Sequence, residues 1–141
     1  MEKAENNTLN IEERAEYAAQ LKLSGRRNCC QAVTAALSDE TGLSEEQLSQ
    51  IAAGFCAGMG NMEATCGALV GAGIIAGLKT GGAGTLRKTK QISERFKELC
   101  GGAITCRELK GIDRDRVLCP CEDCVRNAVR AYGEVMGVSA Q

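Results

Sequence analysis

The chain of 141 residues contains no histidine and no tryptophan. Histidine is the commonest general base and the commonest metal ligand, so its absence excludes Ser/His and Cys/His catalytic pairs and every mixed Cys/His zinc site. It also excludes haem attachment through Cys-x-x-Cys-His, because Val125 follows the run from Cys121 to Cys124 where that motif requires histidine. Any metal in this protein must therefore be bound by thiolates, carboxylates or backbone groups.

Aromatic residues and unbalanced charge are also scarce. Two tyrosines and two phenylalanines provide few surfaces for stacking bases, and 17 basic residues nearly cancel 18 acidic ones. Nucleic acid is therefore not an expected partner. The longest apolar stretch, Ala68 to Leu78, is too short to cross a bilayer, and the first 20 residues lack the apolar core of a signal peptide. We expect a cytoplasmic protein without a membrane span.

Cysteine, in contrast, is abundant, since the chain contains nine. This number is above ordinary usage but below the share that marks a short disulfide scaffold, and a chain of this length can bury a core without covalent cross-links. In a reducing compartment, clustered thiols indicate metal binding or redox chemistry more often than structural disulfides. The cysteines are therefore the candidate functional residues.

Hydrophobic periodicity predicts helices and no strand pair. The segment from Cys66 to Leu78 contains four glycines and is otherwise apolar on all sides, which predicts a central, buried helix with Thr65 as its N-cap. We expect an all-α, single-domain bundle of five or six helices around this glycine-rich helix, with a core from about 11 to 137 and a disordered segment at 1–10. The expected helices span residues 11–23, 29–37, 44–55, 66–78, 85–100 and 122–136.

Two local patterns within these helices indicate chemistry. Cys66 follows the expected cap, where the positive end of the helix dipole acidifies a thiol. Gly67 and Gly71 are four residues apart and form a smooth face that another helix or a cofactor can approach closely.

Three cysteines in six residues near the C-terminus form a Cys-x-Cys-x-x-Cys cluster, at Cys119, Cys121 and Cys124. Such a density is hard to explain as core filling. The cluster could bind a soft metal alone or together with Cys56 or Cys100, and its spacing does not separate metal binding from redox use.

The run from Cys66 to Gly71, preceded by Gly58 to Gly60, resembles the C_GCAxxG_C_C family of putative redox-active proteins, which is named for four cysteines. The runs from Cys30 to Val33 and from Cys106 to Gly111 agree with the family pattern, as does a cysteine at the opening of the last helix. The resemblance covers about Ile11 to Gly137. The family is in turn similar in part to the iron-sulfur domain of split-Soret type cytochromes.

This resemblance implies a site that the fold assembles from separate segments. The signature cysteines would serve as redox thiols or cluster ligands, the motif glycines would lie beside a cofactor, and the remaining cysteines are alternates. Cys29 can replace Cys30 in the same register. The signature residues are Cys30, Cys66, Cys106 and Cys124, the glycines are Gly67 and Gly71, and the alternates are Cys29, Cys56, Cys100, Cys119 and Cys121.

Two functions of different kinds remain open on this basis. In the first, the cysteines act as a redox site, either as a dithiol/disulfide couple or as ligands of an iron-sulfur cluster that transfers electrons, and the chain is a possible oxidoreductase with an unknown redox partner. In the second, a closed thiolate site holds zinc for structural purposes, without redox activity. A thiol transferase or chaperone that acts on a partner through the vicinal cysteine pair is a third option. The glycine-smoothed helices also make a homodimer plausible.

Overall fold

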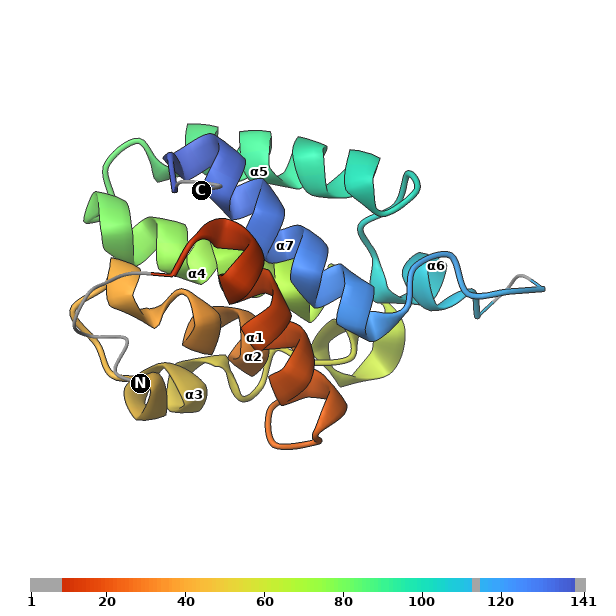
Figure 1. The fold of residues 1–141 in the computed structure, drawn as a ribbon. Coiled ribbons are helices and arrows are strands. Elements are labelled where there is room, and N and C mark those ends of the chain that lie inside the picture. Colours follow the sequence, from red (N-terminus) through yellow and green to blue (C-terminus); the bar gives the residue numbers. More distant parts are fainter. Residues whose placement is uncertain (1–8, 113–114, 139–141) are drawn as a thin grey trace.

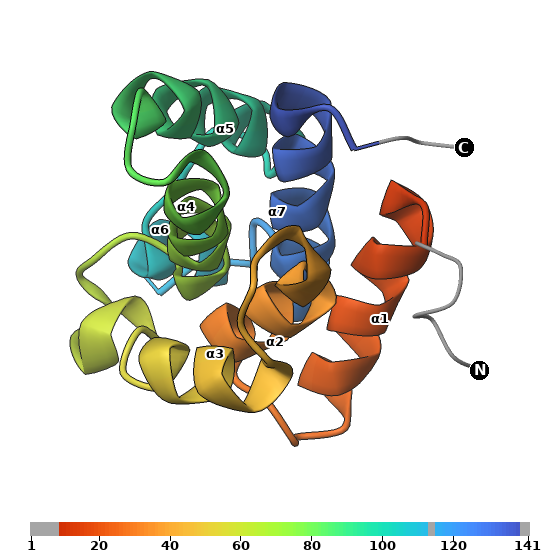
Figure 2. The ribbon, with the colours of Figure 1, turned by 90° about the vertical axis from the view of Figure 1, so that its left-hand side faces the viewer.

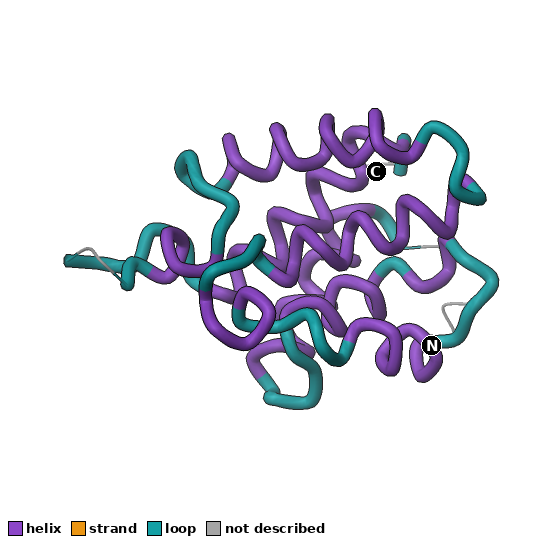
Figure 3. Tube along the Cα trace, turned by 180° about the vertical axis from the view of Figure 1, so that it is seen from behind, coloured by secondary structure: helices purple, strands orange, loops and turns teal. Residues whose placement is uncertain are grey.

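The structure is a computed structural model that describes residues 9–112 and 115–138. In these residues the chain is built from helices and loops (Figure 3), and the only bridge of β type is an isolated one between Thr65 and Thr105. The predicted all-α, single-domain fold is confirmed. Residues 1–8 of the segment predicted to be disordered lie outside the described residues. The helices are α1 (Ile11–Leu23), α2 (Cys29–Ala36), the 3₁₀ turn η1 (Ser38–Glu40), α3 (Glu45–Ala52), the π-type turn η2 (Gly58–Met62), α4 (Gly67–Thr80), α5 (Thr85–Leu99), α6 (Cys106–Lys110) and α7 (Cys121–Met136).

Side-chain caps fix several of the helix starts. Capping boxes at Asn10, Asn28 and Ser44 open α1, α2 and α3, because each cap side chain accepts from the third backbone amide of its helix. The cap predicted for α4 is wrong. Cys66 rather than Thr65 holds the N-cap position, without a side-chain hydrogen bond, and Thr65 instead forms the bridge to Thr105. The first backbone N–H groups of α4 can therefore donate hydrogen bonds to groups other than a capping side chain.

Helices α4 and α7 occupy the middle of the bundle (Figures 1 and 2). α7 packs against α1, α2, α4 and α5, while α4 packs against α2, α5 and α7. The largest fully buried side chains come from several helices and include Tyr132, Phe96, Leu48 and Ile75. Each such burial stabilises the fold by roughly 2 kcal/mol relative to an exposed side chain. No helix in the described part of the chain has both the length and the apolar character needed to cross a membrane.

Two of the glycines in α4 allow close contact with other segments. A Cβ atom at position 67 would lie 2.2 Å from the carbonyl oxygen of Phe55, and one at position 71 would lie 3.0 Å from the carbonyl oxygen of Cys30. Neither position has room for a side chain. The smooth face predicted for α4 thus receives α2 and the segment that follows α3.

That segment, between α3 and α4, is irregular. α3 ends at Ala52 rather than near Phe55, and the chain then turns through η2. Three residues other than glycine, Ala57, Met59 and Met62, adopt left-handed backbone conformations with φ of 53°, 66° and 68°. Each costs about 1–2 kcal/mol relative to an ordinary conformation. Surrounding contacts must hold the segment in place, and it forms one wall of the site described next.

Candidate functional site

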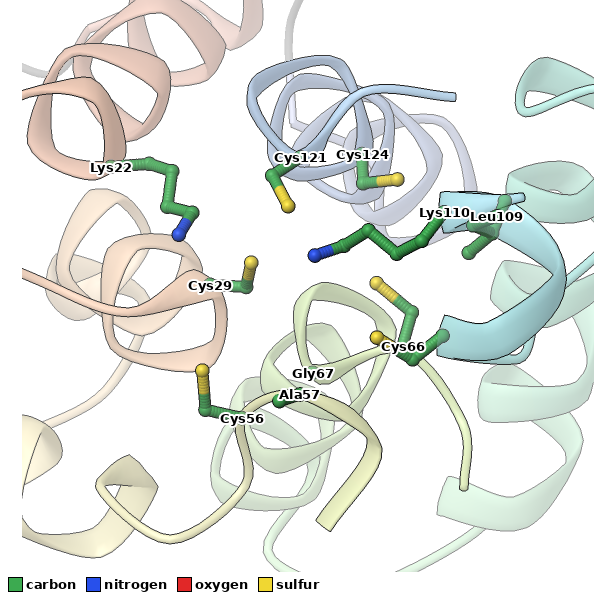
Figure 4. Close-up of a pocket in the computed structure, with 11 residues that line it drawn as sticks. Lys22, Cys29, Cys56, Ala57, Cys66, Gly67, Leu109, Lys110, Cys121 and Cys124 are labelled. Carbon is green, nitrogen blue, oxygen red and sulfur yellow. The ribbon is translucent and has the colours of Figure 1, made fainter. Parts of the chain in front are cut away.

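Six of the nine cysteines surround one cavity of about 190 Å³ (Figure 4). Protein interiors are packed as densely as organic crystals and contain few voids larger than a water molecule. A cavity of this size, in which cysteines are the commonest lining residues, therefore has room for a bound group. The lining residues are Lys22, Cys29, Cys56, Ala57, Cys66, Gly67, Cys106, Leu109, Lys110, Cys121 and Cys124.

The cavity cysteines come from separate segments that meet at one end of the bundle. Cys29, Cys106 and Cys121 are the first residues of α2, α6 and α7, and Cys66 is the N-cap of α4. The positive end of a helix dipole stabilises negative charge, so the longer helices α2, α4 and α7 favour thiolates, or an anionic group, at this place. Backbone hydrogen bonds from Cys66 N to the Ile104 oxygen (2.8 Å) and from Cys106 N to the Ala64 oxygen (3.1 Å) hold two of the segments together.

Two lysines contribute positive charge to the same cavity. Figure 4 shows the ammonium groups of Lys22 and Lys110 on either side of the sulfurs of Cys29 and Cys121. A hydrogen bond from the Cys29 thiol lowers the pKa of Cys121 to about 5, and Lys110 adds to this effect. The pKa of Cys29 is raised, since it keeps the shared proton. Burial alone would lower the pKa of Lys110. Its hydrogen bond to Cys121, together with the negative charges of the nearby cysteine sulfurs, outweighs burial and raises that pKa.

A second hydrogen-bonded pair of thiols, Cys66 and Cys124, borders the cavity. The hydrogen bond from Cys124 lowers the pKa of Cys66, and the backbone amides of Ala68 and Leu69 lower it further. Both amides lie in the first turn of α4, which has no side-chain cap. The fold thus stabilises a thiolate at Cys66.

Cys106 has a different environment, because burial raises the pKa of its thiol. Its Sγ donates to the thioether sulfur of Met62 at 3.5 Å. Met62 belongs to the strained segment before α4, so this contact joins α6 to the opposite wall of the cavity.

Behind the cavity, three buried sulfurs form a tight group that we call the thiol triad, Cys100, Cys119 and Cys124. Their Sγ atoms all lie within 4.8 Å of one another, so the triad could hold a metal ion. Hydrogen bonds from Cys100 and then Cys124 lower the pKa of Cys119 to about 4. The Asn127 amide nitrogen lies 3.5 Å from the Cys100 sulfur and 3.9 Å from the Cys119 sulfur. Cys124 belongs to both the triad and the cavity lining.

The structure brings three of the four signature cysteines to the cavity, namely Cys66, Cys106 and Cys124. Cys30 is fully buried and is not among the lining residues, and its neighbour Cys29 lines the cavity in its place. Burial, with smaller contributions from nearby Cys56 and Cys66, raises the pKa of Cys30 to about 12. Adjacent residues of a helix point about 100° apart, so only one of the pair can face the cavity. Among the described residues, the lining includes the motif glycine at position 67 but not the one at 71.

The alternates divide between the two groups of sulfurs. Cys29, Cys56 and Cys121 line the cavity, whereas Cys100 and Cys119 belong to the triad. The C-terminal cluster is therefore split, although its members are close in sequence. All nine cysteines are free thiols.

Sequence reasoning missed four residues around these sulfurs. Lys110 is four residues after Cys106 and shares a face with it on α6, so this spacing could have revealed it. Lys22, Met62 and Asn127 reach the sulfurs only through the tertiary fold, and no local signal marks them.

One comparison with known proteins found a match. The family described as "Putative redox-active protein (C_GCAxxG_C_C)" matches residues 27–135, which include all the cysteines of the cavity and of the triad. No curated protein and no solved structure matches the chain. The family match covers well over half of the sequence and contains the glycine-faced helix and every lining residue of the cavity except Lys22. The chain therefore belongs to the C_GCAxxG_C_C family of putative redox-active proteins.

Proposed function

We propose that this protein transfers electrons through an iron-sulfur cluster held by cysteines of the cavity. The observation that carries the proposal is the convergence of six cysteines from five segments of the chain around a cavity of about 190 Å³. A dithiol/disulfide couple needs two sulfurs and no space between them. A cluster needs four sulfurs and a volume to occupy.

The residues around the cavity fit such a group. Thiolates are the usual ligands of iron-sulfur clusters, and a cluster with four thiolates is anionic. The ammonium groups of Lys22 and Lys110 and the starts of the longer helices supply positive charge where this anion would lie. We assign the ligands to the four cysteines at helix starts, Cys29, Cys66, Cys106 and Cys121.

When bound, the cluster supplies one-electron transfer. The protein's part is to hold the four thiolates, to keep Lys110 charged beside Cys121, and to limit water with Leu109 and Ala57 in the walls. The reducing cytoplasm expected from the sequence suits this use of free thiols.

The test is purification without exposure to air, followed by visible absorbance, iron and sulfide content, and electron paramagnetic resonance of the reduced sample. We expect iron and sulfide in the wild type and in Cys30→Ser, and their loss in Cys121→Ser. Cys30 is the matched control because it is buried outside the cavity. A colourless wild-type protein that takes up neither iron nor sulfide on anaerobic reconstitution contradicts the proposal.

A dithiol/disulfide couple is the second candidate, favoured by the hydrogen-bonded pair of Cys66 and Cys124. In this case two thiols would lose two protons and pass two electrons to a redox partner as the S–S bond forms. Thiol counts distinguish the candidates: a couple loses two thiols on oxidation in protein free of iron, and Cys124→Ser abolishes that loss.

A further inference from the structure

We infer that the thiol triad is a second metal site, which shares only Cys124 with the cavity lining and holds one thiophilic divalent ion of the zinc type. Zinc binds thiolate sulfur at 2.3 Å in a tetrahedral arrangement, which puts two of its sulfurs about 3.8 Å apart. The three Sγ atoms already lie within 4.8 Å of one another, and all three residues are buried. Small side-chain movements are enough to place them around one ion.

Asn127 provides an independent reason to regard the triad as a site. Its side chain is buried in α7, its oxygen accepts a hydrogen bond from Arg130 Nη1 at 3.0 Å, and its nitrogen donates to the Leu99 oxygen at 3.3 Å. These contacts fix the amide so that its nitrogen faces Cys100 and Cys119. Donors that face ligand sulfurs in this way typically orient and stabilise them in metal sites.

The charge balance favours a divalent ion. Three thiolates with one divalent ion carry a net charge of −1, against −2 with a monovalent ion, and buried charge is costly. Among the described residues, no further cysteine or carboxylate has a ligand atom within 4.8 Å of all three triad sulfurs. In the thiol form, the carbonyl oxygen of Cys119 accepts from Cys124 Sγ at 3.5 Å. Because Cys124 loses its proton when it binds the ion, this oxygen then becomes available as a further ligand.

An ion at the triad would also support the cavity. Cys100 caps the C-terminal end of α5, whereas Cys119 precedes α7. The backbone amides of Leu118 and Cys119 both donate to the Leu109 oxygen in α6, each at 3.0 Å. The ion would close the long connection between α5 and α7, and so hold α6, which carries Cys106, against the cavity.

The experiment titrates reduced, iron-free protein with Zn²⁺, and with Co²⁺ as a coloured probe whose spectrum reports thiolate coordination. We expect one ion per chain in the wild type, and binding at least 100-fold weaker in Cys100→Ser and Cys119→Ser. The matched variants Cys29→Ser and Cys121→Ser remove cavity sulfurs and should keep wild-type affinity. Zinc content thus reports the triad while iron content reports the proposed cluster, so either proposal can fail alone.

Two outcomes overturn the inference. One is the absence of stoichiometric binding in the wild type, and the other is loss of binding in Cys121→Ser but not in Cys119→Ser, which would place the ion in the cavity. Should a serine variant not fold, Asn127→Leu keeps all three thiols and is expected to bind Zn²⁺ about 10–100-fold more weakly. Unchanged affinity in that variant, with the helical circular dichroism of the wild type, would also count against the site.

Discussion

The cavity and the thiol triad use the same residue type in two different environments, although both include Cys124. The cavity has space, two lysines and several helix starts. The triad has sulfurs in close contact and an amide in place of an ammonium. Space and cations suit an extended anionic group, whereas tight spacing and an amide donor suit a single ion. The surroundings of a cysteine, more than its place in a sequence motif, decide which chemistry it can support.

The largest expected effect is a reciprocal loss of metal on changing neighbouring cysteines. Cys121→Ser should lose iron and keep zinc, while Cys119→Ser should lose zinc and keep iron, because each thiolate serves one site. Cys124→Ser should follow Cys119→Ser, since we assign Cys124 to the triad. Measuring both metals in the same anaerobic samples tests the comparison, and loss of both metals in all three variants would show a single site.

A change in the cavity wall should destabilise the fold by a few kcal/mol. A methyl group at Gly67 would collide with the Phe55 carbonyl, so Gly67→Ala should lower the free energy of unfolding by about 3 kcal/mol. Gly73 is the matched control on the same helix, because its added Cβ would lie 3.8 Å from Thr89 Cγ2, an ordinary contact. Gly73→Ala should gain up to about 1 kcal/mol of helix propensity. Equal urea midpoints for the two variants would contradict this packing.

The cavity lysines should affect the redox potential of a cluster in the cavity and leave the zinc affinity of the triad unchanged. Lys110→Met removes a positive charge beside Cys121, so the midpoint potential of the bound cluster should fall by about tens of millivolts. Zinc affinity should stay as in the wild type. Lys79→Met is the control, because Lys79 is half-exposed and pairs with Glu40 at 3.9 Å. An equal shift of the potential in Lys79→Met and Lys110→Met would contradict a local effect of Lys110 on the cavity.

The smallest effect is expected at Cys30. Cys30→Ala removes one buried sulfur and should cost about 1 kcal/mol of stability without changing the content of either metal. Cys29→Ala should instead lose iron. If Cys30→Ala loses iron while Cys29→Ala keeps it, the signature register with Cys30 as ligand is the correct one.

Much of the fold could be predicted from sequence because its signals are local. The spacing of apolar residues predicts the major helices, and the Ser44 capping box marks the start of α3. The α4 cap was wrong because Thr65 takes part in a long-range bridge to Thr105, which no local pattern reveals. The short helix α6 also raises the helix count above the expected five or six.

The candidate site could be predicted only in part. The type of residue was evident, and three signature cysteines do meet at the cavity. Sequence spacing could not show that Cys119 and Cys121 face different sites. Cys119 precedes the extended Pro120, whereas Cys121 is the first residue of α7, and this change of backbone conformation directs the two side chains differently. The partnership of Cys100 with Cys119 depends on how α5 packs against α7, and that is a tertiary property.

The convergence of α2, α4 and α7 has a consequence for how the protein holds together. Each helix start carries roughly half a positive charge, and two ammonium groups lie nearby. When the thiols are protonated and no anion is present, these like charges repel one another. The packing of these helix starts against one another therefore depends on negative charge in the cavity. Hydrogen exchange at the first amides of α4 would then report, residue by residue, whether the cavity is filled.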